Sequence, residues 1–178
     1  MAKLSEKKLL EIAKKIKLLI LDVDGVLTDG SIILDNKGNE LKAFHVRDGH
    51  GIKMLLKKGI HVAIITGRYS KVVEKRAQEL HIQDVYQKSH DKRIPYRQLL
   101  EKYSLLDSEI ACAGDDIVDI PLLKMCGLPV AVADAHDTVK AIVKMTTREK
   151  GGRGAVRELC DFLLKAKGLW KDIMDEYA

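Results

Sequence analysis

The sequence has few cysteines and no long uncharged apolar run. Its three cysteines, Cys112, Cys126 and Cys160, are odd in number and far apart, a pattern that fits neither a disulfide framework nor a zinc site. We therefore expect reduced, buried thiols in a cytoplasmic protein. No segment approaches the length of a membrane span, and lysines interrupt the apolar residues of 9–20, so neither a membrane anchor nor a signal peptide is expected.

Aromatic residues are also scarce, and charge of one sign is not concentrated in any stretch. Phe, Trp and Tyr make up 4% of the chain, and its 31 basic and 26 acidic side chains, net charge +5, are interleaved. A nucleic-acid surface usually combines a basic patch with aromatic residues, so nucleic-acid binding is not expected. The mild positive balance instead suits a small anionic substrate.

What the sequence does contain is enough apolar material for one sizeable core. The 178 residues are 46% apolar, and we expect one domain over residues 1–178. Strand-like runs alternate with helical patterns, which predicts an α/β fold: a three-layer, Rossmann-like parallel sheet with helices on both faces. The expected strands are residues 18–21, 61–65, 84–86, 110–113 and 128–132. The expected helices are one after Ser5 and those over residues 48–58, 70–80, 92–103, 117–125, 139–144 and 155–165.

A β-hairpin is expected at about residues 31–44, because two apolar runs flank the turn-forming segment 35–39. Only this hairpin and one helix lie between Asp24 and Thr66, which is too little chain for an inserted cap domain. The site should therefore be open within one subunit. Residues of about 168–178 are expected to form a polar C-terminal tail.

Polar side chains follow four of the expected strands, at the point where each strand ends. In chain order they are Asp22 and Asp24, then Thr66 with Gly67, then Lys92, and finally Asp115, Asp116 and Asp119. The carboxyl ends of parallel strands share one edge of a sheet, where open α/β sheets bind ligands. A lone Asp-x-Asp is most often a solvated turn, but four such segments in register predict a single functional crevice.

The residue types in this crevice indicate phosphoryl transfer. Carboxylates with backbone carbonyls and water form the oxygen-rich shell that Mg²⁺ prefers. A hydroxyl, backbone N–H groups and a lysine are suited to binding phosphoryl oxygens. A cation site beside an anion site is what phosphoryl transfer requires, since its catalysis is mostly positioning and charge stabilisation.

These residues resemble the four motifs of the haloacid dehalogenase superfamily of aspartyl-nucleophile phosphatases. More narrowly, six segments in order resemble the 3-deoxy-D-manno-octulosonate 8-phosphate phosphatases: DVDGVLTDG, FHVRDGHGI, TGR, SHDK, GDDIVDIP and GGRGAVRE. The resemblance covers nearly the whole chain. It implies a Mg²⁺-dependent phosphomonoesterase that hydrolyses this sugar-acid phosphate through an aspartyl phosphate, in lipopolysaccharide precursor synthesis.

The resemblance also implies a role for each matched residue. Asp22 corresponds to the nucleophile and Asp24 to the general acid/base. The implied Mg²⁺ ligands are Asp22, the carbonyl of Asp24, and Asp115, with Asp116 or Asp119 supporting the water shell of the metal. Thr66, Gly67 and Lys92 match phosphate-binding positions.

The arginines admit two interpretations. Arg47 and Arg68 are either surface ion-pair partners or ligands of the sugar-acid carboxylate, to which a guanidinium donates two parallel hydrogen bonds. The glycine-rich segment 151–154 is expected to be mobile and to let Arg153 reach the substrate in a neighbouring subunit. The relatives it resembles are homotetramers whose hairpins associate and whose tails cover adjoining sites, so a homotetramer is expected.

Two alternatives to the octulosonate phosphatase stay open at this stage. Related enzymes act on nine-carbon sugar-acid 9-phosphates, although Arg68 after Thr66-Gly67 favours the octulosonate. A phospho-receiver module also combines an acidic cluster, a Thr and a Lys on a parallel sheet. There the phosphorylated Asp follows a middle strand, and no such Asp precedes Thr66 here.

Overall fold

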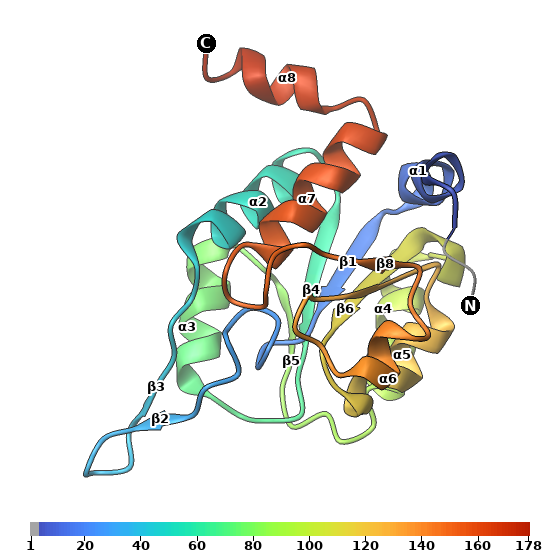
Figure 1. Cartoon of the computed structure of the whole chain (residues 1–178). Coiled ribbons are helices and arrows are strands. Elements are labelled where there is room, and N and C mark those ends of the chain that lie inside the picture. Colours follow the sequence, from blue (N-terminus) through green and yellow to red (C-terminus); the bar gives the residue numbers. More distant parts are fainter. Residues whose placement is uncertain (1–3) are drawn as a thin grey trace.

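A computed structural model describes residues 4–178 and contains a six-stranded parallel sheet in the order β5-β4-β1-β6-β7-β8 (Figure 1). The strands are β1 Leu18–Leu21, β4 His61–Ile65, β5 Asp84–Tyr86, β6 Ile110–Gly114, β7 Leu128–Ala131 and β8 Met145–Thr146. All four residues of β1 are buried, as expected of a central parallel strand that is covered on both faces. The predicted parallel sheet is confirmed.

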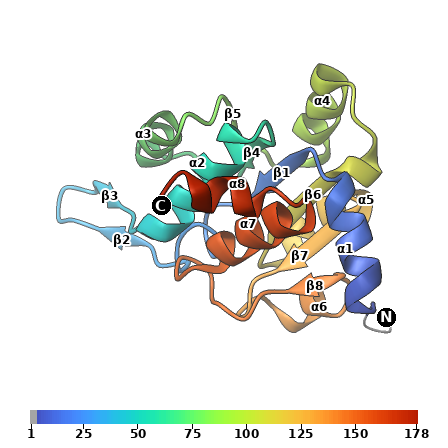
Figure 2. The same ribbon diagram turned by 90° about the horizontal axis from the view of Figure 1, so that it is seen from above.

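Helices cover both faces of this sheet, which gives the predicted three layers (Figures 1 and 2). Helices α2, α3 and α7 pack together over one face, and α4 with α5 over the other. The bounds are α1 Glu6–Lys15, α2 Val46–Lys57, α3 Lys71–Leu80, α4 Arg93–Tyr103, α5 Ile120–Met125, α6 Asp137–Lys140, α7 Ala155–Ala166 and α8 Trp170–Asp175, with short 3-10 helices at Asp107–Glu109 and Ile117–Asp119.

The register of the sheet brings three strand ends level with one another. Leu21, the last residue of β1, pairs with Ile64 of β4 on one side and Ala113 of β6 on the other. The residues that follow these three strands therefore emerge side by side at one edge. This is the geometry that the sequence predicted for the functional crevice.

Residues 137–146 differ from their predicted structure. The helix predicted over 139–144 is α6 at Asp137–Lys140, because the His136 side chain accepts the Thr138 N–H (3.2 Å) and starts the helix earlier. Met145 and Thr146 are then free to pair with Val130 and Ala131 of β7, and they form β8. A two-residue strand gives no periodic signal in a sequence.

The predicted polar tail contains a helix, α8, that packs on its own chain. Ile173 is buried, Glu176 forms ion pairs with Lys57 and Lys58 of α2, and the Tyr177 hydroxyl lies 2.8 Å from Nε2 of His50. The C-terminal residues thus contact α2 of the same subunit.

The hairpin between β1 and α2 is present and consists of β2 Ile33–Leu34 and β3 Glu40–Leu41. It projects from the rest of the molecule (Figure 1). Apart from this hairpin, α2 and the core strand β4 are the regular elements between Asp24 and Thr66, so these described residues contain no cap domain. Within residues 4–178, no helix is both long enough and apolar enough to cross a membrane.

Candidate active site

A cleft of about 420 Å³ opens at the carboxyl ends of the central strands. Of the predicted site residues, it is lined by Asp22, Asp24, Thr66, Gly67, Arg68, Lys92, Asp115 and Asp116. Gly30, Ser89, His90 and Val118 complete its wall. Four segments that are distant in sequence therefore meet as predicted.

Lys92 lies at the floor of the cleft between two carboxylates. Its Nζ donates to Oδ1 of Asp22 (2.8 Å) and to Oδ1 of Asp119 (2.6 Å), and its side chain is 4% exposed. Burial works to lower the pKa of Lys92, but the two carboxylates outweigh it and the pKa lies above its usual value. Lys92 thus stays cationic and holds Asp22 and Asp119 in place.

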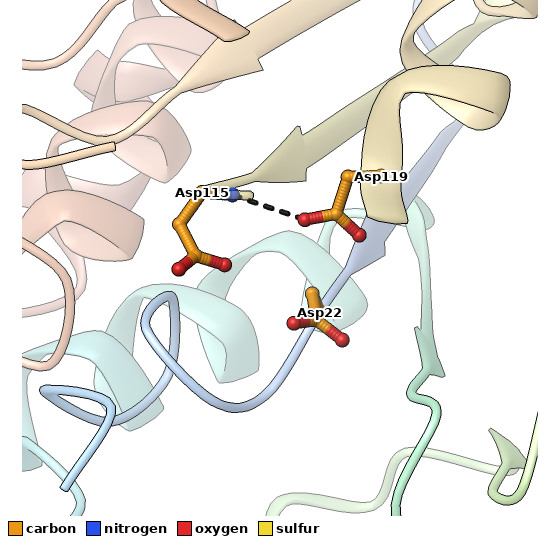
Figure 3. A group of neighbouring side chains, drawn as sticks. All are labelled: Asp22, Asp115 and Asp119. Atoms are coloured by element: carbon orange, nitrogen blue, oxygen red, sulfur yellow. Dashed lines mark hydrogen bonds between the residues drawn. The ribbon is translucent and has the colours of Figure 1, made fainter. Parts of the chain in front are cut away.

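Asp22, Asp115 and Asp119 form a group whose carboxylate oxygens lie within 4.8 Å of one another (Figure 3). Burial raises the pKa of Asp22 to about 6, with Asp119 adding to the rise. Burial also raises the pKa of Asp115 to about 7, again with a contribution from Asp119. Carboxylates placed this close favour a bound cation, and an all-oxygen donor set suits Mg²⁺.

The three carboxylates are not equally free to bind a metal ion. Oδ1 of Asp119 accepts from Lys92, and its Oδ2 accepts from the backbone N–H groups of Asp115 (3.0 Å) and Asp116 (3.4 Å). Asp22 accepts from Lys92 through one oxygen, and among the described residues the Asp115 carboxylate has no hydrogen-bond donor. Asp22 and Asp115 thus fit the role of ligands, and Asp119 that of a support.

Glycines make this close packing possible. A Cβ on Gly25, whose φ is +88°, would lie 2.1 Å from Oδ2 of Asp115. A Cβ on Gly114 would lie 2.6 Å from the Asp119 side chain. Any larger residue at these two positions would displace the carboxylates.

Asp24 is surrounded by charged groups, and two of them, Glu40 and Lys42, were not identified by the sequence analysis. Its Oδ1 contacts the Nζ of Lys42, and its Oδ2 lies 3.7 Å from Nε of Arg68. Glu40 contacts both cations, at 3.4 Å from Lys42 and 2.8 Å from Arg68. Glu40 and Lys42 belong to the hairpin, so no strand-end pattern marks them in the sequence.

Two predicted residues lie outside the cleft of their own chain. Arg47 and Arg153 line a separate depression of about 180 Å³. Arg153 there forms an ion pair with Asp29 (Nη2 to Oδ2, 3.2 Å). Neither arginine therefore lines the cleft that holds Asp22 and Asp24.

The expectation that segment 151–154 is mobile is wrong for its first two glycines, which are buried against the loop that follows β1. A Cβ on Gly151 would lie 1.7 Å from the Gly25 carbonyl oxygen, and one on Gly152 would lie 2.4 Å from the backbone of Thr28. The Gly152 N–H donates to the Val26 carbonyl (2.9 Å). These glycines serve close packing rather than movement.

Comparisons with known proteins agree with this geometry. Residues 78–159 match a family model described as haloacid dehalogenase-like hydrolase. The chain is 53% identical to the 3-deoxy-D-manno-octulosonate 8-phosphate phosphatase of Escherichia coli K12, over 88% of this chain and 83% of that protein.

Solved structures show the same similarity in three dimensions. The phosphatase of the same name from Yersinia pestis is 48% identical, with a TM-score of 0.91 over 92% of this chain and 88% of that one. The Moraxella catarrhalis protein, in complex with magnesium, phosphate and a KDO molecule, is 37% identical, with a TM-score of 0.95 over 98% of this chain and 100% of that one. The chain therefore belongs to the haloacid dehalogenase-like hydrolases, and within them to the phosphatases.

Proposed function

We propose that this phosphatase hydrolyses 3-deoxy-D-manno-octulosonate 8-phosphate to the free sugar acid and phosphate, with Mg²⁺ as cofactor. The observation that carries the proposal is that one cleft combines the paired carboxylates Asp22 and Asp24 with Lys92 and Asp115. Support for the substrate comes from relatives of that name that are about half identical to this chain. The reaction is a cytoplasmic step of lipopolysaccharide precursor synthesis.

In the first step, Asp22 is the nucleophile. Its carboxylate oxygen attacks phosphorus in line, and the bond from phosphorus to the sugar oxygen breaks with its electron pair on that oxygen. Asp24 gives its proton to this oxygen, so the sugar leaves as an alcohol. An aspartyl phosphate on Asp22 remains, which divides one difficult displacement into two easier ones.

In the second step, Asp24 acts as a base. Its carboxylate takes a proton from a water molecule that attacks phosphorus, and the bond between phosphorus and Asp22 breaks. Inorganic phosphate leaves, and both aspartates return to their starting states. Positioned acid/base catalysis of this kind contributes roughly 10²–10⁴-fold to the rate.

The remaining groups neutralise and hold charge. Asp22, Asp115 and the Asp24 carbonyl would hold Mg²⁺, with Asp116 and Asp119 supporting its water shell. The ion, when bound, supplies positive charge that offsets the repulsion between the anionic nucleophile and the phosphate. Lys92, Thr66 and the Gly67 N–H bind the phosphoryl oxygens, because a buried ammonium and oriented donors suit an anion.

We further propose that the active form is a homotetramer of single-domain subunits spanning residues 1–178. Exposed apolar residues on the hairpin support this assembly, since a two-stranded ribbon is at best marginally stable in water. In it, Arg68 binds the sugar-acid carboxylate, while Arg47 and Arg153 reach a site from a neighbouring subunit.

Phosphate release from a panel of esters tests the substrate. The panel contains the octulosonate 8-phosphate, a nine-carbon sugar-acid 9-phosphate and p-nitrophenyl phosphate, each with Mg²⁺ and with excess EDTA. We expect the highest kcat/KM for the octulosonate and no turnover in EDTA. A higher kcat/KM for the nine-carbon ester would reassign the substrate, and absence of turnover on every ester would reject the proposal.

The nucleophile is tested by Asp22→Asn, which should abolish turnover because an amide does not attack phosphorus. Asp24→Asn should slow turnover by about 10²-fold or more, since proton transfer is lost. Phosphate release and the mass of the intact protein are measured together, which also detects deamidation of the introduced asparagine. Near-normal turnover by undeamidated Asp22→Asn would place the nucleophile elsewhere.

A further inference from the structure

Four charged side chains from three separate segments form a closed ring beside the cleft. Lys42 contacts Asp24 and Glu40, and Arg68 contacts the same two carboxylates. Basic and acidic side chains alternate around the ring. Two of its members come from the ends of β1 and β4, whereas Glu40 and Lys42 come from the hairpin.

Lys42 is the most deeply buried member of the ring. Its side chain is 1% exposed, compared with 45% for Arg68. A lysine ammonium without partners is costly to bury, so Lys42 depends on Asp24 and Glu40 for its compensation. The dependence is mutual, because removing Lys42 leaves one Asp24 oxygen without its cation.

The two cations of the ring hold different oxygens of Asp24. Lys42 contacts Oδ1, while Arg68 approaches Oδ2 from the other side at 3.7 Å. Such an arrangement restricts rotation of the carboxyl group about its bond to Cβ. A general acid must lie within hydrogen-bond reach of the leaving oxygen, so its orientation affects the rate directly.

We infer that Lys42 is a positioning residue for Asp24, through which the hairpin takes part in catalysis in its own subunit. Glu40 anchors Lys42 from the opposite side. The inference rests on the proposed acid/base role of Asp24. It predicts that Lys42 affects the step in which a proton goes to the leaving group, and not phosphate binding in general.

The test compares two esters of nearly equal size, phenyl phosphate and p-nitrophenyl phosphate, by kcat/KM with Mg²⁺. The phenolate of the first is the more basic leaving group and needs the proton more. We expect Lys42→Met to lower kcat/KM for phenyl phosphate at least about fivefold more than for p-nitrophenyl phosphate. Lys37→Met is the matched control, because Lys37 lies on the exposed turn of the same hairpin. Lys37→Met should leave kcat/KM unchanged for both phenyl phosphate and p-nitrophenyl phosphate.

Asp24→Asn provides the reference, and it should show the same preference for the better leaving group. The double variant Lys42→Met/Asp24→Asn should lose no more than Asp24→Asn alone, since the two residues act as one unit. Melting temperatures of all variants separate this effect from a loss of fold. If Lys42→Met does not fold, Glu40→Gln replaces it and should give a smaller loss with the same preference.

The outcomes separate the inference from the proposed function. Equal losses on both esters for Lys42→Met, or full additivity in the double variant, would overturn the role of Lys42 while the role of Asp24 stands. Absence of any leaving-group preference in Asp24→Asn would overturn both.

Discussion

At the scale of single residues, the cleft holds more negative charge than its own lysine neutralises. Lys92 is shared between Asp22 and Asp119, and Asp115 has no cation of its own among the described residues. Burial and these like charges therefore raise the pKa of Asp22 to about 6 and that of Asp115 to about 7. Without a metal ion, the folded state is destabilised whenever both groups are ionised.

The pH dependence of stability follows from these values. Both pKa values lie above the unfolded-state value of 3.8, so between about pH 4 and pH 7 these two groups bind more protons in the folded chain than in the unfolded chain. The free energy of unfolding therefore falls as pH rises through this window. We expect the Tm in EDTA to drop by roughly 5 °C or more between about pH 5 and pH 7.5.

Mg²⁺ should raise the Tm more at the higher pH, where its ligands would otherwise repel one another. Carboxylates with lowered pKa values, such as Glu40, are already ionised at pH 5 and do not alter the slope. Asp115→Asn removes the group with the higher of these two pKa values and should flatten the curve. A Tm that stays level or rises with pH in EDTA would contradict this assignment.

Arg68 should select the substrate. A charge-assisted contact contributes roughly 1.5–3 kcal/mol, so Arg68→Ala should lower kcat/KM for the octulosonate phosphate about tenfold or more. Hydrolysis of p-nitrophenyl phosphate should change little, because its good leaving group needs little proton transfer from Asp24, which Arg68 approaches at 3.7 Å. Arg68→Lys keeps the charge without the planar fork and should be intermediate. Equal losses on both esters would place Arg68 in the common phosphate site instead.

Most residues that line the cleft could be predicted because each follows a strand of the central sheet. Asp22, Thr66 and Asp115 are examples: once the strands are located, the shared edge of a parallel sheet brings the side chains together. Lys42 could not be predicted this way. Its ammonium reaches Asp24 from the hairpin, and the tertiary placement of the hairpin has no signature in the local sequence.

At the scale of elements, the turn at Gly151 and Gly152 packs against the backbone of the loop that follows β1. The turn itself lies outside the cleft. Asp134 fixes this turn by accepting the Gly151 N–H (3.0 Å). Buried Asp48 of α2 fixes the chain just beyond it, by accepting the N–H groups of Gly154 (3.3 Å) and Arg157 (2.7 Å). The loop that carries Asp24 is thus packed between the metal-site carboxylates and a rigid turn.

Gly151→Ala should therefore impair catalysis more than stability. Its Cβ would displace the Gly25 carbonyl, and a shift of about 1 Å in a catalytic group can lower the rate roughly 10²-fold. Gly127→Ala is a matched control, since its Cβ would meet the backbone of Ser108 at 2.7 Å. Both variants should lose Tm, and only Gly151→Ala should lose kcat. Similar kcat values for the two would show that the turn has a purely structural role.

The ends of the elements show where sequence reasoning failed. Strands β1, β4 and β5 have their predicted bounds, and β1 and the buried part of β4 are short apolar runs between polar or turn residues. Helix α8 was missed because its stability comes from packing against α7, with Ile173 buried and Lys165 lying over the Trp170 ring, and not from its own pattern. An isolated six-residue helix is too short to be stable in water, so only the tertiary contact reveals it.

At the scale of the whole molecule, the hairpin is the part of the structure that most needs a partner. Ile32 is 60% exposed and Leu34 59% exposed, on a ribbon that projects away from the core (Figure 1). Association of hairpins in a closed assembly would cover these side chains and pair the free strand edges. The ring of charges at the hairpin base would then lie close to the subunit interface.

We expect light scattering at micromolar concentration to give the mass of a tetramer. Ile32→Ser/Leu34→Ser should shift the mass towards smaller species and raise KM for the sugar phosphate more than for p-nitrophenyl phosphate. Leu106→Ser, which replaces an exposed leucine remote from the hairpin, is the control. It should leave the mass of the assembly and the KM values unchanged. A stable, fully active wild-type monomer would reject the assembly and with it the contribution of Arg47 and Arg153 from a neighbour.

The contact between the glycine turn and the loop after β1 also limits how this sequence can change over time. Gly151 and Gly25 are distant along the chain, yet their backbones leave no room for a side chain between them. A substitution or insertion in either segment is therefore tolerable only if the other segment changes with it. In engineering terms, the loop after β1 and the turn before α7 form one inherited unit, and a loop grafted from another phosphatase would have to bring its matching turn.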